Sequence, residues 1–378
     1  MRYLILLGLI FCFFNQAFSA DITSEPKNEL HNGESSNATE MRSEAIRSAA
    51  MRDGSAHSSS MADGKEDKIT EMPKNLSAND VQFLPYERPK GFDWLTESPG
   101  NLVSFVKRIR PKENVWWLTG IGLSTAVLIK YDQAILDESQ RFARRLGLIS
   151  DTKTGRETYT IIDWSVGDYD LPFVIPKNLN SVMYFIGDGL PQIGIIGGLT
   201  SYGLMNDDSK ALSTASQTLE ALFVTGIVVQ VLKRTTGREA GFKATQSGGK
   251  WQYFPNQIEY SKNVPKYDAF PSGHLATVMA STTVLAENYP DHGYIRPVGY
   301  TLMTLLGFAM MNNGVHWAGD YPVGIAIGYT AARVAVERNR KQRWLKANKP
   351  ESVSQMKFNT VVPFAKADAL GFSYISNF

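Results

Sequence analysis

Six segments of mostly apolar residues, separated by polar stretches, dominate the chain from about residue 115 onward. Gly and Ala recur within them, and the alternation of β-branched residues that marks strands is weak. Small residues let helices approach closely. The pattern therefore predicts an all-α protein, a helical bundle of about six core helices. The segments are Val115–Ile129, Val182–Leu204, Leu219–Leu232, Leu275–Ala286, Val298–Met311 and Tyr321–Val336.

The start of the chain has a different composition. An almost unbroken apolar run, Tyr3 to Phe14, is followed by small residues up to Ala20, which predicts a signal peptide over residues 1–20. Residues 21–82 are polar and contain no aromatic residue, so this stretch cannot bury enough surface to fold and is predicted to be a disordered spacer. We expect an exported protein of the bacterial cell envelope.

Two further segments flank the predicted helical domain, which we place at residues 113–340. In residues 83–112, aromatic residues return and apolar residues then alternate with basic ones from Leu102 to Arg110, which predicts an amphipathic lead-in that lies either on a membrane or on the core. Residues 341–378 form a basic tail. Apolar residues alternate from Leu370 to Phe378, and this alternation predicts a short β-hairpin after Pro363.

Charge and length leave two arrangements at the membrane open. Most of the apolar segments are shorter than the roughly 20 residues that a spanning helix needs. Basic residues between Arg338 and Lys346 favour a cytoplasmic tail, whereas six spans after an exported amino terminus would leave this tail outside. A periplasmic bundle, soluble or bound at the membrane surface, avoids the conflict; an integral bundle is the alternative.

Composition excludes some classes of partner and cofactor. The net charge of +2 gives no reason to expect nucleic acid as a partner. The only cysteine, Cys12, lies in the predicted signal peptide, so we expect no disulfide and no cysteine-based metal site in the exported chain. Carboxylates and histidines do not cluster as metal ligands do, and we expect no cofactor.

Three short motifs carry the candidate chemistry. Lys233 opens the sequence Lys-Arg-Thr-Thr-Gly-Arg at the end of the third apolar segment, where cations would neutralise a phosphate. Pro271-Ser272-Gly273-His274 precedes the fourth segment, so its backbone N–H groups would lie at a helix start, where anions bind. His316 and Asp320 are four residues apart and would share one face of a helix, with the carboxylate orienting the imidazole.

These motifs, in this order, resemble those of the type 2 phosphatidic acid phosphatase and vanadium haloperoxidase superfamily, over about Asn114 to Arg338. The resemblance implies that His316 attacks phosphorus, that Asp320 orients it and that His274 protonates the leaving oxygen. It further implies that Lys233, Ser272 and the Gly273 N–H hold the phosphate. The expected partners are a phosphorylated lipid or a small organic phosphate, and a membrane surface.

The chain departs from the family pattern at two positions that matter. The arginine of the first motif falls on Ala240 and the arginine of the third on Met310. Each charge-assisted hydrogen bond of this kind contributes about 1.5–3 kcal/mol, so the loss of two would weaken transition-state binding greatly. Arg238, in a Gly-Arg pair like that of many bacterial members, is our candidate to replace one of them as a phosphate ligand; Arg234 and Lys243 are nearby.

Three functions agree with these motifs. The first is an envelope phosphatase that hydrolyses a lipid-linked or other organic phosphate or pyrophosphate through a phosphohistidine. The second is a catalytically silent member that serves as an envelope scaffold, and the third is a vanadium-dependent haloperoxidase. Each motif also has a purely structural interpretation, since cations commonly end helices and Asp320 could cap one.

Overall fold

The computed structural model describes residues 84–91, 93–110, 114–148, 150, 158–162, 165–166, 169–170, 173–347, 360–366 and 369–375. The predicted signal peptide and spacer lie outside these residues. The described chain divides into two compact units. The larger unit runs from Pro85 to Arg340 and contains all three candidate motifs.

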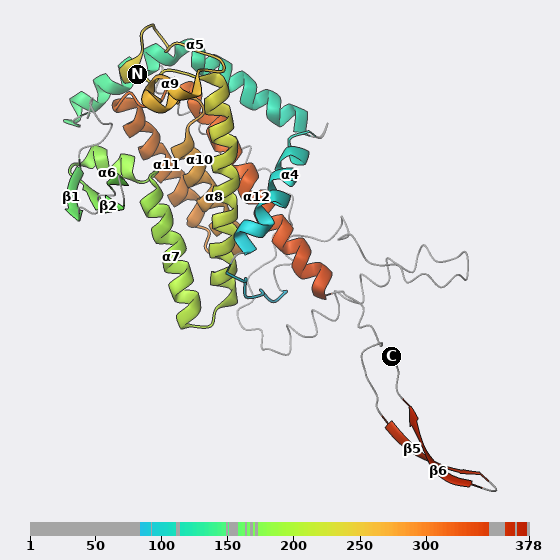
Figure 1. The fold of residues 1–378 in the computed structure, drawn as a ribbon. Helices are drawn as coiled ribbons and strands as arrows, with labels where there is room; N and C mark the ends of the chain where they lie inside the picture. Colours follow the sequence, from blue (N-terminus) through green and yellow to red (C-terminus); the bar gives the residue numbers. More distant parts are fainter. Residues whose placement is uncertain are drawn as a thin grey trace. The chain divides into compact units, whose positions relative to one another are not determined.

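The larger unit is an all-α bundle, as the apolar pattern predicted (Figure 1). Each predicted apolar segment lies in helical structure, but the second is divided at Gly187 and Asp188 into two helices. The helices are α4 (Asp93–Arg108), α5 (Val115–Arg145), α6 (Leu179–Phe185), α7 (Gly189–Met205), α8 (Ser209–Thr236), α9 (Gln257–Lys262), α10 (Gly273–Asn288), α11 (Ile295–Asn312) and α12 (Tyr321–Ala347).

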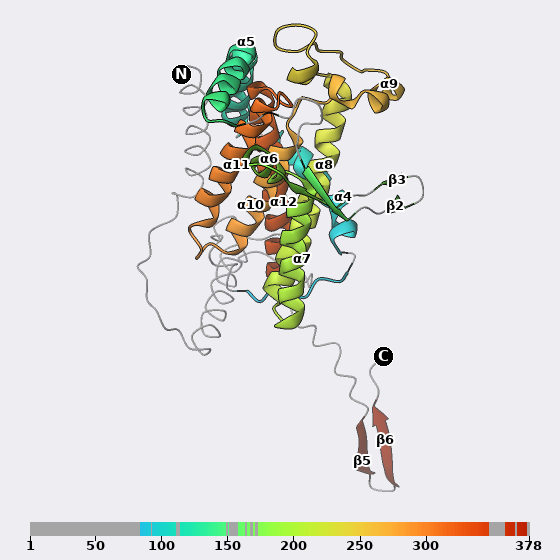
Figure 2. The same ribbon diagram turned by 90° about the vertical axis from the view of Figure 1, so that its left-hand side faces the viewer.

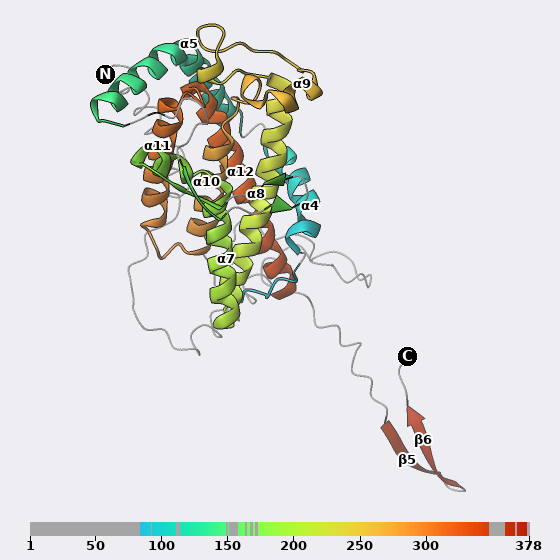
Figure 3. The ribbon, with the colours of Figure 1, turned by 60° about the vertical axis from the view of Figure 1, so that its left-hand side comes forward.

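Helix α10 lies inside the bundle, against α8 on one side and α11 on the other (Figures 2 and 3). Helix α12 approaches it through two glycines one turn apart. A Cβ added at Gly324 would lie 2.4 Å from the Ser272 carbonyl oxygen, and one at Gly328 would lie 2.1 Å from that of Ala276. Only glycine fits at these contacts, so they fix the distance between α12 and the start of α10.

The predicted amphipathic lead-in contains α4, which packs on the core. Phe105 is buried in a cluster with Val224 and Val229 of α8. Beside this cluster, the Asn101 side-chain amide donates to the Glu220 carboxylate at 2.8 Å. Of the two placements expected for this segment, the structure has the one on the core.

Glu220 is expected to make stability depend on pH. Burial raises the pKa of its carboxyl from 4.5 to about 7. The folded state then holds more protons than the unfolded state between these values, so stability falls as the pH rises through this range, by about 3 kcal/mol in total. Glu220→Gln should remove this loss, which urea unfolding at about pH 5 and about pH 8 would measure. Equal pH dependence in Glu220→Gln and in the exposed control Glu259→Gln would contradict the prediction.

The structure also contains short strands. Strand β1 (Thr158–Ile162) pairs antiparallel with β4 (Phe173–Pro176), and β2 (Ser165–Val166) pairs with β3 (Tyr169–Asp170). The apolar pattern did not predict these four strands. They are short, with two to five residues each.

The smaller unit comprises Leu84, the end of α12 and a carboxyl-terminal hairpin. Leu84 packs with Trp344, and Arg343 donates to the Leu84 carbonyl oxygen at 2.8 Å. The hairpin joins β5 (Thr360–Lys366) to β6 (Ala369–Ile375). The sequence placed it after Pro363, but Pro363 lies within β5, opposite Phe372.

One helix among the described residues, α8, is long and apolar enough to cross a membrane. In its most apolar window, 44% of the residues are buried inside the protein. A core helix of a bundle passes the same test, so this single helix is weak evidence for a membrane span.

Candidate active site

The three motifs come together at one end of the bundle. Lys233 lies one turn before the end of α8, and Gly273 begins α10. His316 and Asp320 lie in the short connection between α11 and α12. The imidazole rings of His274 and His316 are 5.9 Å apart, between centroids. A Cβ added at Gly273 would lie 4.0 Å from Cε of Lys233, so the lysine stem passes the start of α10.

His316 is held in one tautomer by a backbone carbonyl. Its Nδ1 lies 2.7 Å from the carbonyl oxygen of Ala269 and 3.4 Å from Oδ2 of Asp320. A carbonyl oxygen only accepts, so in the neutral imidazole Nδ1 carries the proton and Nε2 has the lone pair. The sequence did not reveal Ala269 as the closer partner, because a backbone contact of this kind has no sequence signature.

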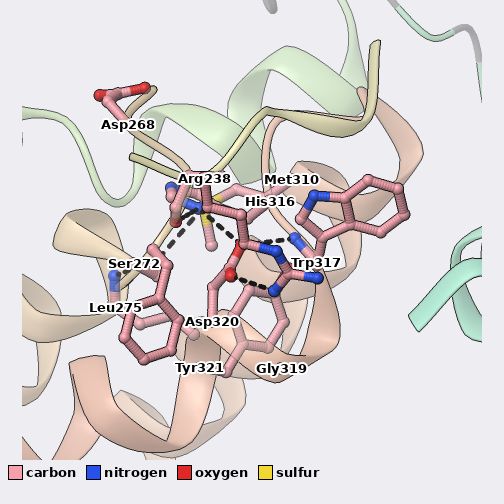
Figure 4. A network of polar contacts seen from close by, with 12 residues as sticks. Arg238, Asp268, Ser272, Leu275, Met310, His316, Trp317, Gly319, Asp320 and Tyr321 are labelled. Atoms are coloured by element: carbon pink, nitrogen blue, oxygen red, sulfur yellow. Dashed lines mark hydrogen bonds and ion pairs between the residues drawn. The ribbon is translucent and has the colours of Figure 1, made fainter. Parts of the chain in front are cut away.

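Asp320 contacts His316 by a different route from the one expected. The spacing of four suggested one face of an α-helix, but His316 precedes a 3₁₀ turn (Ala318–Asp320) that leads into α12. Oδ2 of Asp320 accepts the Trp317 N–H at 2.7 Å, and Oδ1 accepts from Arg238 at 2.6 Å (Figure 4). The carboxylate therefore mainly fixes the turn and secondarily orients the imidazole.

Arg238 occupies the interior, which corrects our expectation that it holds the substrate phosphate. The residue is fully buried. One terminal nitrogen donates to Asp320, and the other donates to Asp132 at 2.5 Å and to the Gly248 carbonyl oxygen at 2.7 Å. Both terminal nitrogens have protein partners, so the guanidinium is a structural counter-charge in this arrangement.

Two tryptophans enclose this buried ion cluster. The Arg238 guanidinium lies 4.8 Å from the ring centroid of Trp251 and 5.2 Å from that of Trp317. Both distances are within the range of cation–π contacts, which stabilise a desolvated guanidinium. The indole N–H of Trp317 in turn donates to the Glu239 carbonyl oxygen at 2.8 Å. The aromatic rings thus keep water from the charges and tie the segment after α8 to the His316 turn.

Asp132 is a site residue that the sequence analysis missed. It comes from α5, is fully buried, and accepts the Gly319 N–H at 2.8 Å in addition to the Arg238 bond. Burial raises the pKa of its carboxyl to about 6, against the opposing effect of Arg238. The available signal was a lone aspartate four residues after Leu128 and three before Ile135, on the buried face of the helix.

Met310 fills the space beside Ser272. Ser272 is the N-cap of α10, and its hydroxyl lies 3.5 Å from the Leu275 N–H, which it caps, and 3.8 Å from the Met310 sulfur. Met310 and Ala240, the two residues at the vacant arginine positions, are both buried. Neither position therefore supplies a cation to the start of α10.

Lys233 is the cation of the first motif that reaches this region. Its ammonium forms an ion pair with Asp268 at 2.9 Å, and its side chain is 8% exposed. Asp268 lies just before Ala269, so the segment that positions His316 also partly neutralises the lysine. An incoming phosphate would compete with Asp268 for this ammonium.

His274 has a weakly paired imidazole. Its Nε2 lies 3.7 Å from a carboxylate oxygen of Asp188, the residue that divides the second apolar segment. Burial lowers the pKa of His274, while Asp188 acts in the opposite direction. A proton donor at this position is therefore charged mainly under acidic conditions.

Asp188→Asn is expected to shift the pH profile of any phosphate release. If His274 donates a proton, kcat/KM falls as the pH rises through its pKa. Removal of the neighbouring negative charge lowers this pKa further, so the alkaline limb should move to lower pH by about one unit. Steady-state rates across the acidic range would measure the shift. Asp291→Asn, beside the exposed loop residue His292, is the matched control, and identical profiles for the two variants would refute the assignment.

The comparisons with known proteins agree with the motifs. The PAP2 superfamily model matches residues 215–344, a stretch that contains all three motifs. The resemblance inferred from the sequence is thereby confirmed. Neither the curated proteins nor the solved structures gave a match. The match supports a phosphatase-type hydrolase at the level of the superfamily, and together with α8 it fits membrane association weakly.

Proposed function

We propose that the protein is a phosphatase that removes a phosphoryl group from an organic phosphate through a phosphohistidine at Nε2 of His316. The observation that carries this proposal is the Nδ1 contact with the Ala269 carbonyl oxygen, which places the ring proton of the neutral imidazole on Nδ1 and makes Nε2 the nucleophilic nitrogen. Attack by Nε2 forms a nitrogen–phosphorus bond as the ester oxygen leaves with a proton from His274. Water then cleaves the new bond and restores the imidazole.

Lys233, Ser272 and the Gly273 N–H would hold the phosphate in this reaction. Ser272 and Gly273 lie at the start of α10, where unpaired N–H groups favour anions, and the side chain of Lys233 passes this point from α8. The described residues contain no group of three His, Cys, Asp or Glu side chains that could hold a metal ion. We propose a reaction without a divalent cation, in a protein of the cell envelope, because Lys233 and the backbone N–H groups at the start of α10 can neutralise the charge of the phosphate.

The test is phosphate release by the purified protein from a panel of soluble and lipid-borne phosphates, with and without EDTA. A trapped phosphoenzyme should be labile to acid and stable to base, as a phosphoramidate is. Turnover in EDTA together with this trapped species is the expected result. Turnover that requires added Mg²⁺ or Zn²⁺, or a phosphoenzyme with the stability of an ester, would overturn the mechanism.

A silent family member is the second candidate, and three observations favour it. His316 is only 2% exposed, Lys233 is paired with Asp268, and the arginine positions hold the buried residues Ala240 and Met310. A protein of this kind would keep the fold and bind phosphate weakly. Absence of both turnover and vanadate binding in the folded protein would favour it over the phosphatase.

Met310→Arg is expected to strengthen oxyanion binding. The new guanidinium would lie beside Ser272, and one charge-assisted hydrogen bond to an oxyanion changes affinity by about tenfold or more. Vanadate titration would measure the gain. Met311→Arg is the matched control, because Met311 is equally buried but its sulfur contacts Ser139. Equal vanadate affinities in the two variants would show that position 310 does not face the bound oxyanion.

A further inference from the structure

The segment after α8 presents apolar side chains to solvent. It leaves the end of α8, runs through α9 and returns to the start of α10 (Figures 1 and 3). Tyr253 is 68% exposed, Phe254 77% and Ile258 65%, and Val264 is also exposed. These four apolar side chains all lie within the twelve residues from 253 to 264. We call them, together with the exposed cations Arg234, Lys243, Lys250, Lys262 and Lys266 of the same segment, the basic–aromatic surface.

The same stretch of chain carries five exposed cations. Within residues 234–266, only Glu259 is an exposed carboxylate. Glu239 is buried and accepts backbone N–H groups of Thr245 and Lys250. Among the described residues, none of the exposed cations of this segment forms an ion pair with a carboxylate, so the surface carries a net positive charge. The cations are Arg234, Lys243, Lys250, Lys262 and Lys266.

The backbone holds Phe254 in an unfavourable conformation. Its φ is +52°, in the left-handed region that bulky side chains rarely adopt. The Phe254 N–H donates to the Thr235 carbonyl oxygen at 2.9 Å, so the end of α8 fixes this conformation. Asparagine or glycine would fit here with less strain. A strained residue with an exposed aromatic ring indicates that the ring serves a purpose outside the folded chain.

The basic–aromatic surface is attached directly to the candidate active site. The Gln252 N–H donates to the Gly237 carbonyl oxygen at 3.0 Å, one turn beyond Lys233. Trp251 stacks on Tyr253 and packs on Phe270, two residues before Ser272. A ligand bound at this surface therefore lies near the residues proposed to hold phosphate.

We infer that the basic–aromatic surface binds an anionic lipid bilayer. Aromatic side chains insert at the level of the headgroups, while lysines and arginines interact with the lipid phosphates. Ile258 and Val264 favour a bilayer over a nucleic acid, because aliphatic side chains cannot stack on bases as aromatic ones do. The binding is peripheral and requires no helix to cross the membrane.

Docking at a bilayer agrees with a lipid-borne phosphate, a substrate that the resemblance implies, and its kinetic consequence rests on the proposed phosphatase reaction. A protein docked in this way holds its candidate active site against the headgroups. A lipid-borne phosphate would then reach the site without leaving the membrane. Variants of the surface should slow hydrolysis of phosphatidic acid in vesicles and leave hydrolysis of a soluble phosphate ester unchanged.

Flotation with vesicles tests the docking independently of catalysis. The full chain should float with vesicles of phosphatidylcholine and phosphatidylglycerol in equal amounts, and should float less at high salt, which screens the charges. Tyr253→Ser/Phe254→Asn should reduce binding, and asparagine suits the left-handed backbone, so the fold is retained. Lys262→Gln/Lys266→Gln should weaken binding about 25-fold, since each lysine contributes about fivefold.

Matched controls separate this surface from general charge and hydrophobicity. Tyr294→Ser removes an exposed aromatic ring from the α10–α11 connection, at the end of α10 remote from Ser272. Lys107→Gln/Lys130→Gln removes two exposed lysines of α4 and α5. Both controls should float as the parent does. Flotation that is equal with phosphatidylcholine alone, unchanged in the surface variants, or reduced equally by the controls would overturn the proposal.

Discussion

His316→Asn is expected to lower phosphate release by at least about a thousandfold while the fold is retained. The asparagine amide nitrogen replaces Nδ1 and can still donate to the Ala269 carbonyl oxygen, so the buried contact survives. What disappears is Nε2, the atom proposed to attack phosphorus. Phosphate release under saturating substrate, with circular dichroism as the check of folding, would measure the effect.

The control for this variant is His292→Asn. His292 lies in the exposed connection before α11 and should tolerate the change without effect on the rate. His316, in contrast, is only 2% exposed. An alanine at this position would leave the Ala269 carbonyl oxygen without its partner, so alanine is the less informative substitution. A His316→Asn protein that turns over at the parent rate would exclude the phosphohistidine.

Arg238→Met is expected to destabilise the fold by about 3–5 kcal/mol. The variant leaves Asp132 and Asp320 as two buried carboxylates without their shared counter-charge. Part of the loss should be regained at low pH, where the Asp132 carboxyl, whose pKa burial raises to about 6, becomes protonated and one buried charge disappears. Urea unfolding followed by tryptophan fluorescence suits this variant, because Trp251 and Trp317 contact the guanidinium.

Arg234→Met is the matched control. Arg234 is exposed, lies over the ring of Tyr260 and is four residues from Arg238 in the chain. Its loss should change stability by no more than about 0.5 kcal/mol, as is usual for surface substitutions. If the two methionine variants unfold at the same urea concentration, the buried ion cluster does not stabilise the fold as we infer.

The sequence predicted the helices better than the polar contacts. Apolar segments located the core helices because burial of one face leaves a periodic trace in the chain. The apolar pattern did not show that α5 continues to Arg145, since the last turns of α5 are mostly polar. The strands β1 to β4 were missed because runs of two to five residues are too short to show the alternation that marks a strand.

The motifs located the candidate site but not the role of each residue. Lys233, His274 and His316 lie together as the resemblance implied, whereas Arg238 faces the interior. Its partner Asp132 is more than a hundred residues away in the chain, and a single sequence carries no record of such a pairing. A charged residue can serve substrate or fold, and only its surroundings distinguish the two uses.

The burial of Arg238 affects how activity should be inferred in related chains. A residue required for folding is retained by selection whether or not the protein is an enzyme. The Gly237–Arg238 pair would therefore persist in a lineage that has lost catalysis, and its presence is a poor marker of an active phosphatase. Positions 240 and 310 are more informative. An arginine at either position would not be needed to neutralise Asp132 and Asp320, because Arg238 already pairs with both.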